Sequence, residues 1–353
     1  MKRFILKTSL TAFPALLLLI SVNYIGDAAK IFHDTYELEM AEIINSGNYV
    51  TNISNYDHRI FQKHLISNVK RRPDVLIIGS SRAMLINSEY FENQHVLNNS
   101  VSGASIEDLV AIYQLYKSKG MFPNKIVIGI DPWTFNENSG QNRWQSLKYE
   151  YNRFFSSSHL INSSLATNYD KYLELLSLSY FQNSLKNIPQ IIKAKEKPQS
   201  TMEKYNATYT KLLDGSLVYG NAVRNATNLE VEEKARKYTQ GEIYGIENFY
   251  SLSPKIIDIF KKFITELKEK EIEIAFFLTP YHPTVYRVIK DDYSMVVKAE
   301  DFIIKYSQTN HIKLYGSFNP EKLGLDASYF CDGMHCKEAA IKKIMNAGER
   351  SIP

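Results

Sequence analysis

A serine stands directly after a buried apolar run, and an acid and a histidine lie close together near the end of the chain. Ser81 closes the segment 73–81, PDVLIIGSS, which is typical of a buried strand followed by a tight turn. Asp332 and His335 are three positions apart on a turn, so a carboxylate and an imidazole can point into one site. A hydroxyl deprotonated by an imidazole whose tautomer an acid holds is the chemistry of nucleophilic acyl transfer. These residues are therefore predicted as nucleophile (Ser81), base (His335) and orienting acid (Asp332).

Each of these motifs, taken alone, also fits a purely structural role. A serine after a strand commonly caps the next helix, and Asp332 is suited to cap the last helix while His335 lies on the surface. The turn after residue 78 lacks the glycine-rich run with lysine that defines a phosphate-binding P-loop. A metal site at the later turn is disfavoured, because a tight turn rarely presents three ligands together. No cofactor or metal is predicted.

Apolar runs alternate with amphipathic stretches over most of the chain. The expected strands are 73–81, 95–105 (running into a loop), 125–131, 273–280 and 311–316, and the expected helices are 106–120, 172–181, 253–271, 298–310 and 336–348. Strands that are apolar throughout are typical of parallel sheets with both faces covered. This pattern predicts an α/β fold, a doubly wound, flavodoxin-like sheet with helices on both faces. Ligands of such sheets bind at the carboxyl ends of the strands.

The remaining segments suggest a modular organisation. Residues 1–30 form a membrane anchor or signal peptide, residues 31–70 a polar helical stalk, and residues 71–353 the α/β domain. Residues 140–250, rich in Asn, Ser, Tyr and Lys, interrupt the strand–helix alternation. They are expected to be a largely helical insertion.

The N-terminal segment favours export of the chain. Residues 8–26 carry no charge and, as a helix, would span about 28 Å, enough to cross a bilayer core. Lys2, Arg3 and Lys7 precede this stretch, which predicts a cytoplasmic N-terminus and an extracytoplasmic domain. An uncleaved single-pass transmembrane helix is favoured over a cleaved signal peptide, for which the small residues near Ala28 offer a weak cleavage site.

Charge and cysteine content narrow the classes further. A net charge of +4 without a dense basic stripe argues against nucleic acid as a partner. Cys331 and Cys336 are too few for a disulfide framework or a four-ligand zinc site. In an exported protein they could form one disulfide that stiffens the turn carrying His335, and the alternative is a pair of free thiols.

Taken together, these motifs resemble those of the SGNH (GDSL-like) hydrolase family. The first family block, Gly-Asp-Ser after the first strand, is similar to residues 79–81, which implies Ser81 as nucleophile. The second block is similar to 96–103, VLNNSVSG, and implies that the N–H groups of Ser81 and Gly103 bind the oxyanion. The last block, Asp-x-x-His, corresponds to Asp332 and His335. The resemblance covers residues 73–135 and 270–349.

Two positions depart from the family pattern. Ser80 replaces the usual acidic residue, and Asp131 stands where the third block has the asparagine that donates to the oxyanion. An ionised carboxylate cannot donate a hydrogen bond. Either Asp131 is protonated, or it has another role, or another residue donates in its place. The candidate replacements are Asn98, Asn99, Tyr281 and His282.

The resemblance, together with the N-terminal segment, implies an extracytoplasmic, membrane-anchored serine esterase or O-acyltransferase. Similar anchored proteins of bacterial envelopes act on acetyl or related esters of polysaccharides, beside multi-span membrane O-acyltransferases. The alternative is a catalytically weak module that binds polysaccharide or serves as a scaffold for such an acyltransferase. Asp131 and the long Tyr- and Asn-rich insertion are the features that favour this alternative.

Overall fold

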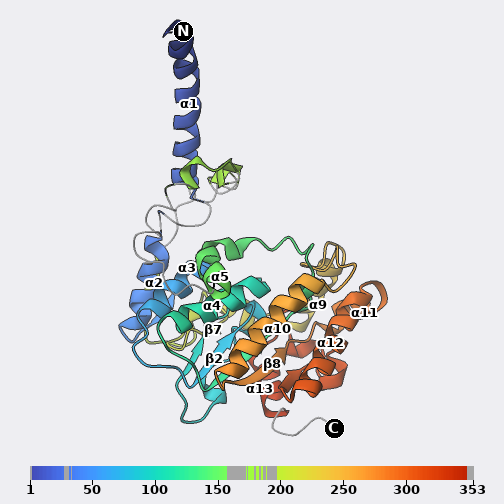
Figure 1. The fold of residues 1–353 in the computed structure, drawn as a ribbon. Helices are drawn as coiled ribbons and strands as arrows, with labels where there is room; N and C mark the ends of the chain where they lie inside the picture. Colours follow the sequence, from blue (N-terminus) through green and yellow to red (C-terminus); the bar gives the residue numbers. More distant parts are fainter. Residues whose placement is uncertain are drawn as a thin grey trace.

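The fold is an α/β body from which the N-terminal helix α1 (Lys2–Gly26) extends (Figure 1). The computed structural model describes residues 2–27, 32, 34–156 and 197–347 and, between them, 172, 174–178, 180–182, 184, 185 and 188. No helix within these described residues is both long enough and apolar enough to cross a membrane. The transmembrane anchor therefore stays a prediction.

Five parallel strands form the central sheet, in the spatial order β3-β2-β4-β8-β9. Their bounds are β2 (Val75–Ile78), β3 (Val96–Asn98), β4 (Lys125–Gly129), β8 (Glu273–Leu278) and β9 (Lys313–Gly316). Each lies inside a segment expected to be a strand. Because the strands are parallel, their carboxyl ends and the loops that follow meet at one edge of the sheet.

Alternate residues of each strand pack into two separate cores, so helices cover both faces of the sheet. Leu76 and Phe276 pack on one face with α4 (Ile106–Ser118), α10 (Pro254–Glu269) and α12 (Ser294–Asn310). Val75 and Phe277 pack on the other face with α13 (Glu338–Ala347). This two-sided burial explains why the strands are apolar throughout rather than alternating.

The helices of the body have the following bounds: α2 (Thr35–Asn45), α3 (His58–Ser67), α4 (Ile106–Ser118), α5 (Lys148–Phe155), α8 (Asn221–Arg224), α9 (Asn228–Thr239), α10 (Pro254–Glu269), α11 (Pro283–Asp292), α12 (Ser294–Asn310) and α13 (Glu338–Ala347). Helix α4 begins with a capping box, in which Ser105 and Asp108 cap each other's backbone N–H. The helix predicted at 172–181 falls partly outside the described residues.

Residues 31–70 hold the helices α2 and α3, and the insertion holds α5, α8 and α9, but a second, smaller sheet adds strands that the sequence did not predict. Four short antiparallel strands stand in the order β5-β1-β6-β7, with bounds β1 (Tyr49–Thr51), β5 (Gln199–Thr201), β6 (Thr210–Lys211) and β7 (Leu217–Val218). Strand β1 comes from the predicted stalk and the other three from the insertion. Strands of two or three residues are too short to show a period of two in the sequence. The small sheet thus joins residues 31–70 and the insertion into one layer.

Candidate functional site

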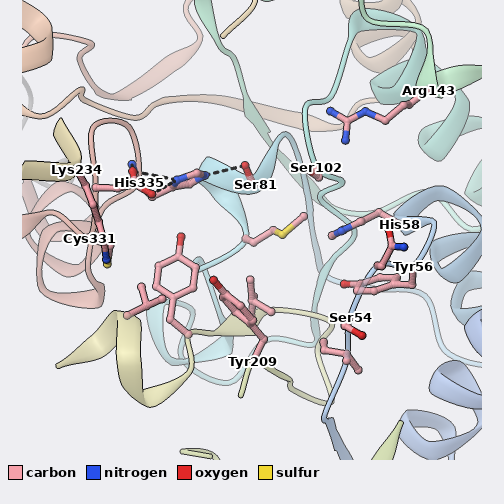
Figure 2. A pocket seen from close by; sticks show the side chains of 17 residues that line it. Ser54, Tyr56, His58, Ser81, Ser102, Arg143, Tyr209, Lys234, Cys331 and His335 are labelled. Carbon is pink, nitrogen blue, oxygen red and sulfur yellow. Dashed lines mark hydrogen bonds and ion pairs between the residues drawn. The ribbon is translucent and has the colours of Figure 1, made fainter. Parts of the chain in front are cut away.

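Ser81, His335 and Asp332 form a hydrogen-bonded line at the carboxyl edge of the central sheet. Ser81 Oγ lies 3.0 Å from His335 Nε2, and His335 Nδ1 lies 2.9 Å from Asp332 Oδ2 (Figure 2). Asp332 as a carboxylate can only accept, so Nδ1 carries the imidazole proton and Nε2 is free to accept the proton of Ser81. The structure thus brings together the three residues that the sequence predicts as nucleophile, base and acid.

Ser81 follows β2 in a short 3-10 turn, Ser81–Ala83. The turn fits closely against β4, because a Cβ on Gly79 would lie 3.0 Å from the Cα of Gly129. Ser80 caps the turn by accepting a hydrogen bond from the N–H of Arg82. Asn98, at the end of β3, donates to the carbonyls of Ala83 and Ile86, at 2.9 and 2.7 Å. The turn that presents the serine is therefore fixed from both neighbouring strands.

The loop that carries His335 is held by the same carboxylate that orients the imidazole. Asp332 Oδ1 accepts hydrogen bonds from the backbone N–H groups of Met334 and His335, both at 2.8 Å. Burial acts to raise the pKa of Asp332, but its hydrogen bonds with His335 and these N–H groups outweigh burial and lower the pKa to about 2. Asp332 is therefore ionised at neutral pH and can stabilise a protonated His335.

Arg82 is a buried residue at the site that the sequence motifs did not single out. Its guanidinium donates to Asp131 Oδ1 at 3.0 Å, to the carbonyl of Met334 at 3.1 Å and to the carbonyl of Thr279. It also lies over the ring of Tyr281, 4.1 Å from the centroid. One side chain thus connects the loops after β2, β4 and β8 to the histidine loop. Arginine suits this task because its planar fork donates in several directions at once.

The contact with Arg82 gives Asp131 a structural role. Asp131 is buried, and burial raises the pKa of its carboxyl while Arg82 and Ser80 act against that rise. Of the alternatives that the sequence left open, the geometry favours another role for Asp131 over that of an oxyanion donor. The sequence carries part of the signal for this contact, because Arg82 and Asp131 have opposite charges and each follows an apolar run. The structure adds that the two strands, β2 and β4, pair with each other.

Gly103 lies in the loop before α4 with a left-handed backbone, φ +56°. This φ favours glycine, and a Cβ there would come within 2.1 Å of the Tyr244 hydroxyl and 2.2 Å of Arg143 Nη2, so both side chains would have to move. Within the described part of the chain, the backbone N–H groups of Ser81 and Gly103 donate no hydrogen bond, as the predicted oxyanion role requires. Ser81 lines the cavity, whereas Gly103 is buried next to Ser102, which lines it.

The other predicted oxyanion donors lie elsewhere. Asn99 is buried, and both ends of its side-chain amide are paired. Its Nδ2 donates to Gln62 Oε1 at 2.5 Å, and its Oδ1 accepts from the Tyr116 hydroxyl at 2.7 Å. Tyr281 is covered by Arg82, and Asn98 holds the serine turn. None of these three side chains lines the cavity at Ser81.

His282 lies behind the histidine loop and also does not line the cavity. The ring of His282 is buried against Phe330, and its Nδ1 accepts a hydrogen bond from the backbone N–H of Thr284 at 3.2 Å. The backbone N–H of His282 donates to the carbonyl oxygen of Gly333 at 3.1 Å. Burial lowers its pKa, while the charges of Glu232 and Asp332 act in the opposite direction. His282 is therefore a neutral core histidine that caps α11 and supports the loop.

The structure has Cys331 and Cys336 as free thiols, which is one of the two alternatives that the sequence left open. The bridge between Phe330 and Cys336 pairs the two arms of the turn, and Cys331 donates its N–H to the carbonyl of His335. Successive residues of such a ladder face opposite sides. Cys336 therefore packs with Phe330 in the core, while Cys331 lines the cavity with His335. Within the described ranges, no group of three His, Cys, Asp or Glu residues is arranged to hold a metal ion.

A cavity of about 790 Å³ opens in front of the Ser81–His335 pair. Its far wall comes from segments that carry no recognisable motif. Figure 2 shows Tyr56 and His58 across the cavity from His335, with Tyr209 below the serine and Arg143 beyond Ser102. Burial and nearby cations lower the pKa of His58 well below its ordinary value, so this wall presents a neutral imidazole. This volume lies in the range of small-molecule binding sites.

Comparison with known proteins places the chain in a family without an assigned activity. No curated protein matches the sequence closely enough to be reported as a relative. A family model described as "Protein of unknown function (DUF1574)" matches residues 14–345, which is nearly the whole chain and includes both the serine turn and the histidine loop. The chain is therefore a member of the DUF1574 family.

Proposed function

We infer that this protein is a serine-dependent esterase or O-acyltransferase of the SGNH type. The observation that carries this proposal is the 3.0 Å contact of Ser81 Oγ with His335 Nε2, continued by the 2.9 Å contact of Nδ1 with Asp332. The strand order, 2-1-3-4-5 when strands are numbered within the sheet, is that of doubly wound, flavodoxin-like folds and supports the resemblance. The site also lies at the sheet edge where such folds bind ligands.

The proposed reaction has two acyl-transfer steps. Ser81 Oγ attacks the carbonyl carbon of an ester while His335 Nε2 takes the hydroxyl proton. The N–H groups of Ser81 and Gly103 stabilise the negative oxygen of the tetrahedral intermediate. The C–O bond to the alcohol then breaks, and His335 returns the proton to the leaving oxygen. Water, or a sugar hydroxyl, attacks the acyl-enzyme by the same route in reverse, which yields hydrolysis or transfer.

The substrate we propose is an acetylated or similarly acylated polysaccharide of the cell envelope. The uncharged stretch at residues 8–26 with basic residues before it supports a single-pass anchor and an extracytoplasmic domain. A multi-span membrane O-acyltransferase is the proposed partner that supplies the acyl group. The large cavity beside the serine supports a substrate bigger than a simple acetate ester.

Labelling with a serine-directed fluorophosphonate tests the proposal. The full-length protein should be labelled at Ser81 and should hydrolyse a small acetyl ester, and Ser81→Ala should lose both properties while keeping its melting temperature. Ser88→Ala serves as the matched control, because Ser88 begins a separate 3-10 turn and does not line the cavity. Full ester turnover by Ser81→Ala would falsify the assignment.

A second function is favoured by one observation, the buried Arg82–Asp131 pair at the position of the family's oxyanion asparagine. With one donor fewer, the site would stabilise an oxyanion less well; in a well-studied protease the loss of such a donor costs about 3–4 kcal/mol. The protein would then bind polysaccharide as a module or scaffold beside the acyltransferase. Glycan binding without fluorophosphonate labelling would favour this function, and labelling at Ser81 would exclude it.

A further inference from the structure

The guanidinium of Arg143 lies against the loop that carries Gly103, here called the glycine loop. It begins the 3-10 turn η4 (Arg143–Leu147), and the absent Cβ of Gly103 leaves the space that its Nη2 and the Tyr244 hydroxyl occupy. Nη2 donates to the Tyr244 hydroxyl, which in turn donates to Gln141 Oε1 at 2.9 Å. Both neighbours are neutral oxygen groups. They fix the guanidinium in place without neutralising its charge.

The charges that line the cavity are unbalanced. Arg143 and Lys234 both line it, and neither lies within 4.0 Å of a carboxylate anywhere in the described part of the chain. Asp332 is the single acidic residue among the lining side chains, and it is paired with His335. Figure 2 shows the two cations on opposite sides of the Ser81–His335 pair. A ligand that reaches across the serine therefore meets positive charge in both directions.

We propose that the cavity selects esters that carry an oxyanion group, a carboxylate or a phosphate, which Arg143 binds beside the glycine loop with Lys234 as the second cation. This inference rests on the proposed function and names its substrate class. A guanidinium held by neutral partners keeps donors for a planar or tetrahedral oxyanion, and charge-assisted hydrogen bonds of this kind are stronger than neutral ones. An acidic glycan, with such groups on the residues next to the ester, has the matching charge pattern.

The experiment compares three acetylated oligosaccharides with the full-length protein: a neutral one, one of uronic acids and one that carries a phosphate. The wild-type kcat/KM should be higher for an acidic ester than for the neutral one, and the preference should shrink as salt is raised. Arg143→Gln should reduce the ratio of acidic to neutral kcat/KM about tenfold, and Arg143→Lys should restore part of it. Comparing the carboxylate and phosphate substrates shows which oxyanion is preferred.

Arg153→Gln is the charge-matched control, because Arg153 is an exposed arginine of α5 that does not line the cavity. It should leave the ratio at the wild-type value. An equal kcat/KM for acidic and neutral esters, or a ratio unchanged by Arg143→Gln, overturns the inference.

Calorimetric titration with inorganic phosphate and with malonate separates this inference from the proposed function. Binding to the wild type that weakens in Arg143→Gln and not in Arg153→Gln supports the oxyanion site even if Ser81 takes no fluorophosphonate label. Labelling at Ser81 without any charge preference leaves the enzyme assignment standing and rejects the oxyanion site.

Discussion

The guanidinium of Arg82 donates to the carbonyl oxygen of Met334 at 3.1 Å, so the residue after the proposed nucleophile is bonded to the residue before the proposed base. The separation of Ser81 from His335 is therefore set by a buried contact between their immediate neighbours, and does not depend on the Ser81–His335 bond alone. Because Arg82 also pairs with Asp131, three strand ends are tied to the histidine loop. A positioning role for Arg82 follows.

Replacing Arg82 tests this role. Arg82→Met would leave Asp131 buried without its partner, which typically costs about 3–5 kcal/mol of folding free energy. Urea unfolding measures the loss, and Arg71→Met is the control, because the Arg71–Asp74 pair is exposed and should contribute less than about 1 kcal/mol.

Activity of the folded fraction separates positioning from stability. Arg82→Lys keeps the charge but loses the fork, so kcat should fall more than KM changes. A kcat equal to that of the wild type in folded Arg82→Lys would contradict a positioning role.

Asp131→Asn tests whether position 131 belongs to the oxyanion machinery. The substitution creates the residue that the SGNH pattern has there, but we expect no gain in kcat, because the side chain faces Arg82 within the protein. We expect the free energy of unfolding to fall by about 1–3 kcal/mol, since the amide oxygen still accepts a hydrogen bond but carries no charge. Ester kinetics and urea unfolding measure the two effects. A rise in kcat would show that position 131 reaches the oxyanion.

Asp332→Asn should separate the orienting bond from the integrity of the loop. The amide oxygen can still accept the N–H groups of Met334 and His335, so the loop is retained, while the interaction that orders His335 Nδ1 is lost. In serine proteases the equivalent exchange lowers kcat about 10⁴-fold. We expect a fall of about 10² to 10⁴ in kcat, with an unchanged circular dichroism spectrum. Activity within about threefold of the wild type would exclude the acid role.

The same variant yields a pH test of stability. The pKa of Asp332 is lowered from 3.8 to about 2 in the folded protein, so its ionised form stabilises the fold above about pH 4. This contribution is lost as pH falls from about 4 to about 2. The difference in melting temperature between wild type and Asp332→Asn should therefore be constant between pH 5 and 7 and shrink at pH 3. A difference that stays the same at pH 3 would contradict the lowered pKa.

Thiol labelling tests the state of the two cysteines. In denaturant without reductant, both Cys331 and Cys336 should be alkylated, because they are free. In the folded protein alkylation should be slow, since burial and the charge of Asp332 raise the pKa of Cys331 to about 12 and Cys336 is in the core. Alkylation of the two cysteines only after reduction would show that they form a disulfide.

The sequence was sufficient where a signal is local and strong. Strands β2, β4 and β8 each contain an uninterrupted apolar run, and Ser81, Asp332 and His335 stand in short motifs whose order and spacing are recognisable. The cavity wall had no such signal, because Tyr56 comes from a loop, His58 from the first position of α3 and Arg143 from a short 3-10 turn. Tyr56 and His58 follow β1, which pairs with strands more than a hundred residues away, and no local pattern encodes that pairing.

The pairing of β1 also bears on how the protein can be produced. Residues 53–56 and His58, which line the cavity, follow shortly after β1, and β1 lies between β5 and β6 in the small sheet. A shortened recombinant protein that starts at β2, the first strand of the central sheet, would keep Ser81 and His335 but would lack the side of the cavity formed by residues 53–56 and His58. Removal of the N-terminal helix for solubility therefore has to stop before Thr35, where α2 begins.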